Sequence, residues 1–188
     1  MKKTLLTAAL LTAFGVAAVA PQAQAANSSS GTITFTGSLT ASTCTVVVNG
    51  GASTQTVTLP TTPLVNGVLS AAGQSAGWTA VTLALSGCTG LTGYTKVLPF
   101  FSGTGIDATT GYLNNTGSAT NVEVALSNAQ STTNALTLAG ASGAQNAGTQ
   151  LLSASTPTFS YFAGYVATGG ASTAGNVSAS VQYTLNYQ

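Results

Sequence analysis

Very few residues of this chain could take part in acid–base, nucleophilic or metal chemistry. The 188 residues include three Lys or Arg, two Asp or Glu and no His, so only 3% are charged, where about a quarter is usual. Apart from two N-terminal lysines, the charged residues are Lys96, Asp107 and Glu123, and we expect all three on the solvated surface. Catalysis relies on histidine, paired carboxylates or an activated lysine or cysteine, and phosphate binding needs several cations. The composition therefore argues against an enzyme, a cofactor and nucleic-acid binding.

The first 25 residues have the anatomy of a secretory signal peptide. Lys2 and Lys3 precede a mainly apolar run over residues 5–20, and Ala23-Gln24-Ala25 forms a small-x-small cleavage site. The alternative, a transmembrane anchor, needs about 20 apolar residues, and this run is shorter. We therefore expect cleavage between Ala25 and Ala26, which leaves residues 26–188 as the exported protein.

Cys44 and Cys88 are the two cysteines of the chain. Export brings them into an oxidising compartment, where such a pair forms a disulfide. Two buried free thiols are the alternative, and a metal site is disfavoured because two cysteines without histidine fall short of four ligands. We expect the disulfide to stabilise the fold by about 3–5 kcal/mol.

The remaining composition favours strands and turns. The chain has 33 Thr, 20 Ser and 22 Gly, and its hydrophobic fraction of 44% is too high for a disordered protein. We expect strands at residues 43–48, 55–59, 79–85, 96–101, 121–126 and 158–167, with Pro99 at an edge or bulge, and two brief strands at 136–138 and 151–152 between long loops. Short strands in a chain of this size predict an all-β protein, either a β-sandwich or, as the alternative, a small outer-membrane barrel.

The clearest patterns lie near the two ends of the exported chain. Residues 176–188 alternate, with one parity apolar: Val177, Ala179, Val181, Tyr183, Leu185 and Tyr187. Residues 31–40 alternate in the same way, with one parity formed by Gly31, Ile33, Phe35, Gly37 and Leu39. Both patterns predict half-buried strands. Periodicity does not tell with which molecule each strand pairs.

Over nearly all of residues 26–188 the sequence resembles the major pilin subunits of chaperone-usher fimbriae of the type 1 kind. The segments that carry the resemblance are residues 31–37 leading to Cys44, Cys88 at the family's spacing, and residues 111–116, 119–122, 165–169, 173–177 and 183–188. Gly175 and the penultimate Tyr187 match the C-terminal signature of that family.

The resemblance implies an incomplete immunoglobulin-like β-sandwich that lacks its final strand, completed by a donor strand from another subunit. Residues 26–40 then form the donor-strand extension, with Gly31, Ile33, Phe35, Gly37 and Leu39 as its donor face, and residues 41–188 form the pilin domain. The strand from Gly175 to Tyr187 lines the groove that receives a donor and pairs with the assembly chaperone. The implied partners are identical or related pilin subunits, a periplasmic chaperone and an outer-membrane usher.

The implied role is that of a structural subunit of a surface fimbrium, reached through the periplasm and acting in adhesion or biofilm formation. A minor or tip fimbrial subunit or adhesin is the alternative within the same resemblance.

Overall fold

The computed structural model describes residues 34, 43–153 and 156–188. The expected signal peptide, its cleavage site at Ala25 and Ala26, and the expected donor residues Gly31, Ile33, Phe35, Gly37 and Leu39 lie outside the described residues. The chain divides into two units, Met1–Ser38 and Leu39–Gln188. The fold presented below is that of the second unit.

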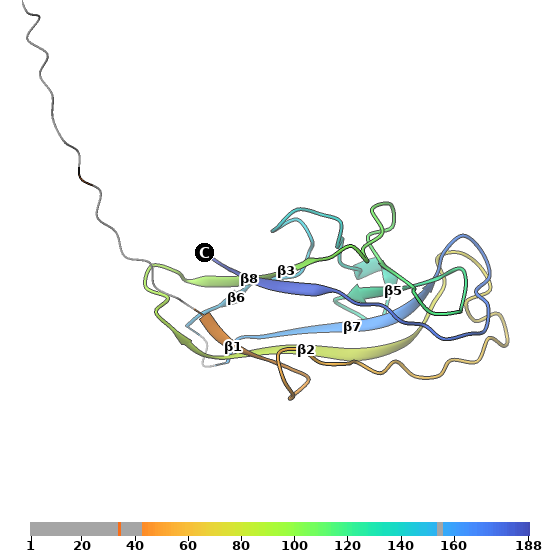
Figure 1. The fold of residues 1–188 in the computed structure, drawn as a ribbon, viewed down its shortest axis with the longest axis horizontal. Helices are drawn as coiled ribbons and strands as arrows, with labels where there is room; N and C mark the ends of the chain where they lie inside the picture. The colour runs from red at the N-terminus through yellow and green to blue at the C-terminus, as the bar shows by residue number, and fades with distance from the viewer. Residues whose placement is uncertain (1–33, 35–42, 154–155) are drawn as a thin grey trace, which may run out of the picture. The chain divides into compact units, whose positions relative to one another are not determined.

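The described residues form two antiparallel sheets, as an all-β sandwich requires. The strands are β1 (Thr43–Val48), β2 (Ser75–Thr89), β3 (Lys96–Ser102), β4 (Leu113–Asn114), β5 (Val122–Ser127), β6 (Gln150–Leu151), β7 (Thr158–Ala167) and β8 (Gln182–Tyr187). One sheet has the order β1-β2-β7-β5-β4 and the other has the order β6-β3-β8. Figure 1 shows them as two layers, with β3 and β8 in one layer and β1, β2 and β7 in the other.

The core lies between the two layers and is formed by the inward parity of each long strand. Leu83 and Leu85 of β2, Phe159 and Tyr161 of β7, and Phe101 of β3 are all buried. The rings of Phe101 and Tyr161 meet edge to face with centroids 5.6 Å apart, a favourable arrangement of aromatic quadrupoles. This packing fixes the distance between the sheets.

Most of the expected strands are confirmed, and two have the predicted bounds. Strands β1 and β7 coincide with residues 43–48 and 158–167, and residues 79–85, 96–101 and 121–126 lie wholly or almost wholly within β2, β3 and β5. The strand β4 was not predicted, because two residues give too short a pattern to recognise. No helix in the described part of the chain is long and apolar enough to cross a membrane.

Two expected strands are wrong. Residues 55–59 are not a strand, although Val57 and Leu59 are partly buried against the core. Residues 136–138 are likewise not a strand; they follow a short 3-10 helix, Thr132–Asn134, and Leu136 and Leu138 are buried. In both segments the alternation reflects burial of one side of an irregular chain, which needs no ladder of hydrogen bonds.

Candidate functional site

The last part of the chain presents an apolar face that the domain covers only partly. We call it the C-terminal apolar face, and it consists of Val177, Ala179, Val181, Tyr183, Leu185 and Tyr187. All six pack against the buried core, yet each remains partly exposed, while the residues between them are mostly exposed. The inward parity of β7, by contrast, is mostly buried. The C-terminal apolar face therefore packs against the core on one side and is partly exposed on the other.

The face differs in one respect from the sequence prediction. Only Gln182–Tyr187 form a strand, whereas the pattern predicted one over the whole stretch from residue 176. The preceding residues are held by a loop instead: the Thr116 N–H donates to the Ser178 carbonyl at 2.8 Å, and the Ala119 N–H donates to the Asn176 carbonyl at 3.1 Å. Because their backbone groups bond to a loop, these residues are extended without belonging to a sheet.

Gly175 does not belong to this face. It is exposed, and a Cβ placed on it would lie 2.5 Å from the backbone nitrogen of Ala119. No side chain fits at that distance, so glycine at this position permits the close approach of two backbones. Gly175 thus fixes how the chain enters the C-terminal apolar face, and its expected place in the groove stays a prediction.

Along its outer edge, β8 has backbone groups without a strand partner in the described residues. Lys96 and Gln188 bond to each other in both directions, N–H to carbonyl at 2.8 and 2.9 Å. Since backbone groups alternate in direction along an antiparallel strand, the N–H groups of Tyr183, Leu185 and Tyr187 point away from β3. In the described part of the chain no strand pairs with that side of β8. An unpaired edge beside an apolar face is a template for adding a strand.

Two tyrosines connect β8 with β1 and with the segment that follows β1. The hydroxyl of Tyr187 accepts a hydrogen bond from the Cys44 N–H at 3.0 Å, and the hydroxyl of Tyr183 donates to the Ser53 carbonyl at 2.8 Å. Cys44 lies in β1, which pairs only with β2 in the described part of the chain. Both β1 and β8 are therefore end strands, and they border the same apolar face.

The expected disulfide is confirmed and pins β1 at this border. Cys44 of β1 and Cys88 of β2 are joined, with an S–S distance of 2.06 Å. The pairing register of β1 and β2 shifts between Thr43 and Thr45, so the bridge lies at an irregularity of the ladder. The covalent link holds the end strand in place where the ladder is weakest.

The opposite edge of the same three-stranded sheet is closed by a side chain. Beyond Val97, which pairs with Gln150 of β6, the edge of β3 has no strand partner in the described residues. There the Gln145 side chain accepts from the Phe101 N–H at 2.8 Å and donates to the Phe101 carbonyl at 2.7 Å. Its amide nitrogen also donates to the Leu138 carbonyl at 2.7 Å. Gln145 thus replaces a strand at Phe101.

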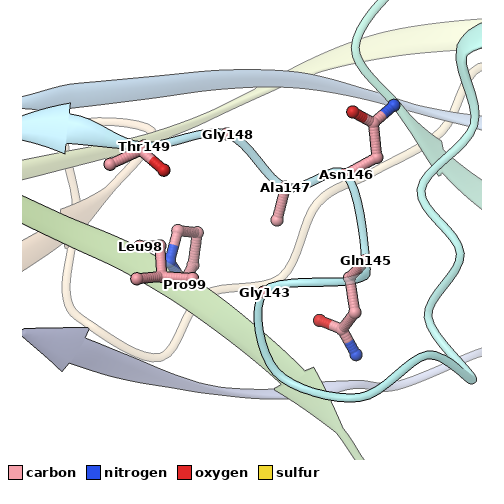
Figure 2. Close-up of a pocket in the computed structure, with 8 residues that line it drawn as sticks. All are labelled: Leu98, Pro99, Gly143, Gln145, Asn146, Ala147, Gly148 and Thr149. Carbon is pink, nitrogen blue, oxygen red and sulfur yellow. The ribbon is translucent and has the colours of Figure 1, made fainter. Parts of the chain in front are cut away.

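Between these two points the edge of β3 has Pro99, which has no N–H to leave unpaired. Pro99 was predicted at an edge or bulge, and it lies at an edge position beyond the reach of β6. Figure 2 shows Pro99 and Leu98 beside the loop of residues 143–149, across a cavity of about 230 Å³. The lining side chains have no titratable group, so the cavity offers no acid–base chemistry.

One of the two carboxylates, Glu123, does not lie on the solvated surface as the sequence predicted. Glu123 was expected on the surface, but it is only 9% exposed on β5, where its Oε2 accepts from the Thr110 hydroxyl at 2.8 Å. Burial raises the pKa of the Glu123 carboxyl, and nearby Asp107 adds to that shift. Backbone N–H groups of Thr110 and Thr109 lower the pKa of Asp107. In the described part of the chain no three His, Cys, Asp or Glu side chains form a group that could hold a metal ion.

Comparison with known proteins gives a consistent result. Residues 59–188 match the family model described as type-1 fimbrial protein, A. The chain is 38% identical over 163 residues to the F17 fimbrial protein of Escherichia coli, covering 84% of this chain and 87% of that protein. It is 37% identical over 170 residues to the major fimbrial subunit SMF-1 of Stenotrophomonas maltophilia (strain K279a), covering 87% of this chain and 95% of that subunit.

Among solved structures, the crystal structure of the CupB6 tip adhesin from Pseudomonas aeruginosa aligns with 61% of this chain, with a TM-score of 0.45 and 16% sequence identity. The chain spans 31% of the length of that adhesin.

Proposed function

Since this chain belongs to the type-1 fimbrial protein family and is a structural fimbrial subunit, we propose that it polymerises by donor-strand exchange. In this mechanism residues 26–40 of one copy form a strand along β8 of the next copy. The donor residues Ile33, Phe35 and Leu39 then cover the C-terminal apolar face. Strand addition of this kind is a known mode of recognition between chains.

The observation that carries the proposal is the outer edge of β8. The N–H groups of Tyr183, Leu185 and Tyr187, which have no strand partner among the described residues, lie beside side chains that are packed against the core but still partly exposed. An added strand would satisfy the backbone groups and bury the face in a single step. The alternating pattern of residues 31–39 has the period that such a strand requires.

The energies expected for side-chain burial and main-chain hydrogen bonds favour a stable joint between the donor strand and the acceptor copy. Full burial of each large donor side chain contributes about 1.5–3 kcal/mol, and each net main-chain hydrogen bond contributes about 0.5–1.5 kcal/mol. Ordering the extension opposes these gains, so the sum exceeds the net binding energy. The extension has no charged residue, so the favourable contributions are apolar burial and main-chain hydrogen bonds rather than ion pairs.

The same open edge explains why assembly would need a chaperone. Before polymerisation, an exposed apolar face with an unpaired strand edge promotes aggregation. A periplasmic chaperone that pairs with β8 would protect this edge during transit, and an outer-membrane usher would then exchange it for a donor strand. This proposal includes removal of residues 1–25 on export, so that residues 26–40 become the N-terminal extension.

The test replaces one donor residue by a charge. Phe35→Asp places a carboxylate where the proposal requires an apolar contact, and we expect it to abolish incorporation into fibres while the exported subunit keeps its fold. Thr36→Asp, on the opposite parity, is the matched control and should still polymerise. The measurement is electron microscopy and immunodetection of material sheared from cells. Normal fibres from Phe35→Asp would contradict the donor-strand assignment.

A further inference from the structure

The four most prominent exposed hydrophobic residues lie in two pairs at opposite ends of the domain. In the described part of the chain the large hydrophobic side chains classed as exposed are Leu64, Val65, Tyr94 and Leu151, at 37, 54, 48 and 55%. Isolated exposed hydrophobic residues are common and need no explanation. Their distribution as two pairs at opposite ends does need an explanation. The chain connectivity shows which ends these are.

Tyr94 and Leu151 lie at the end that contains the disulfide and the C-terminus, which we call the disulfide end. The turn after β2 brings the Thr95 N–H to the Gln188 carbonyl at 2.7 Å, and the Leu152 N–H donates to the Thr95 carbonyl at 2.9 Å. The ring of Tyr94 meets that of Tyr187 edge to face at 6.3 Å. This end is therefore the one at which β1 begins and β8 terminates (Figure 1).

Leu64 and Val65 lie at the other end, which we call the loop end. The Val68 N–H donates to the Val65 carbonyl at 3.1 Å, which closes a turn, and the Ser172 N–H donates to the Leu69 carbonyl at 2.9 Å. The Gly73 N–H donates to the carbonyl of Ala167, the last residue of β7. Figure 1 shows the segment that leads into β2 and the loop that follows β7 at this end, away from the C-terminus.

The direction of β8 determines which end of an acceptor copy lies next to the donor copy. The C-terminal apolar face starts near Ala119 at the loop end and finishes at Gln188 at the disulfide end. A donor strand that pairs antiparallel to β8, the more stable arrangement, runs the opposite way. Its last apolar residue, Leu39, then leaves the acceptor at the loop end.

Only four residues separate Leu39 from Cys44 of the donor's own domain. An extended chain spans at most about 3.3–3.6 Å per residue, so Leu39 and Cys44 can be no more than about 18 Å apart. The disulfide end of the donor copy must therefore lie beside the loop end of the acceptor copy. The two exposed apolar pairs are brought to the same junction.

The donor-strand proposal already stacks successive copies head to tail, and we propose that in this stack Tyr94 and Leu151 of the donor copy cover Leu64 and Val65 of the acceptor copy. The contact rests on the donor-strand proposal and adds a second, independent surface to each joint. It is heterologous, since different patches of the same subunit meet, and such contacts build open filaments when the rotation does not close.

The test is a cysteine cross-link in assembled fibres of the full chain. Val65→Cys combined with Leu151→Cys places one thiol on each surface, and the native cysteines do not interfere because they are already joined. After oxidation and complete denaturation without reductant, we expect a ladder of covalent multimers that collapses to monomer on reduction. Each single variant should remain monomeric.

The matched control pairs Val65→Cys with Ser160→Cys, because Ser160 is an exposed residue of β7 that pairs with Thr82, the central residue of β2, away from both ends. It should give no ladder. Absence of a ladder from the Val65 and Leu151 pair in a preparation that contains fibres would overturn the proposed contact. Covalent dimers from Leu151→Cys alone would also overturn it, since they place two disulfide ends together. If the donor-strand proposal itself is wrong, a different result shows it: the Phe35→Asp variant forms fibres.

Discussion

The two edges of the three-stranded sheet differ in how the backbone groups that face away from the sheet are satisfied. On the β3 side, Val97 pairs with β6, Pro99 has no N–H, and Gln145 bonds both backbone groups of Phe101. On the β8 side, no strand or side chain of the described residues takes the place of a partner along the strand. Within the part of the chain that the structure describes, the domain thus closes one edge with its own residues and leaves the other open.

The difference shows that an open edge is not a general weakness of this fold. Buried backbone groups are expensive to leave unpaired, and the chain satisfies them at β3 with a fully buried glutamine. An equivalent device is missing at β8 within the described residues, where an alternating apolar face lies beside the edge instead. This contrast supports the proposal that the open edge receives a strand from another chain.

The largest expected effect tests the closed edge. Gln145→Leu removes the hydrogen-bond partner of the Phe101 N–H and carbonyl groups, and each buried backbone group left unpaired costs about 1–3 kcal/mol. We expect the free energy of unfolding to fall by about 3 kcal/mol in urea denaturation. Gln130→Leu, at an exposed loop position, is the control and should change it by less than about 0.5 kcal/mol. Equal effects would show that Gln145 does not close the edge.

A smaller effect concerns the buried carboxylate of Glu123, on β5 of the five-stranded sheet. Because burial raises the pKa of Glu123 in the folded protein, its protonated form is favoured by folding, and that contribution is lost as the pH rises through the folded pKa. Glu123→Gln should therefore raise the free energy of unfolding at neutral pH, and the gain should vanish at a pH where the wild-type carboxyl is protonated. Denaturation at both pH values measures this difference.

Asp107 provides a control of opposite sign. Its pKa is lowered by backbone hydrogen bonds from Thr110 and Thr109, so the ionised form stabilises the fold above its unfolded pKa and the contribution is lost as the pH falls. Asp107→Asn should destabilise the protein at neutral pH. A stabilising Asp107→Asn or a destabilising Glu123→Gln would show that these environments are misassigned.

The smallest expected effect concerns the joint at the open edge. With so few charges in the chain, a joint at β8 depends on apolar burial and main-chain hydrogen bonds. Between about 0.01 M and about 1 M salt the Debye length falls from about 30 Å to about 3 Å, yet we expect the polymerised fraction, measured by sedimentation, to stay constant. Dissociation of fibres by salt alone would reveal ion pairs at the joint.

The sequence predicts the strands of this fold better than the long-range contacts between them. Strands such as β7 are encoded locally, since its first four residues alternate between exposed polar and buried aromatic side chains and the rest form a short apolar run. Residues 55–59 have the same alternation, but a strand also needs a hydrogen-bonding neighbour, and the local pattern cannot supply it. For the same reason the alternation of residues 176–188 predicted a strand longer than β8.

The polar residues that close the domain were missed for a related reason. Gln145 lies in a segment of Ala, Gly, Ser and Asn with no periodic pattern, and its partner Phe101 is 44 residues away. Glu123 was expected to be solvated because a charged residue on a strand usually faces water. Its burial depends on the hydroxyl of Thr110, from a loop that the sequence does not relate to β5.

Amide hydrogen exchange along β8 tests the central claim most directly. In the unassembled Phe35→Asp subunit, we expect the amides of Tyr183, Leu185 and Tyr187 to exchange faster than those of Thr184 and Asn186, which point toward β3. In wild-type fibres all five should be protected to a similar degree, because a donor strand then pairs with the outer edge. If the amides of Tyr183, Leu185 and Tyr187 exchange as fast in fibres as in the subunit, the open edge of β8 is not the site of assembly.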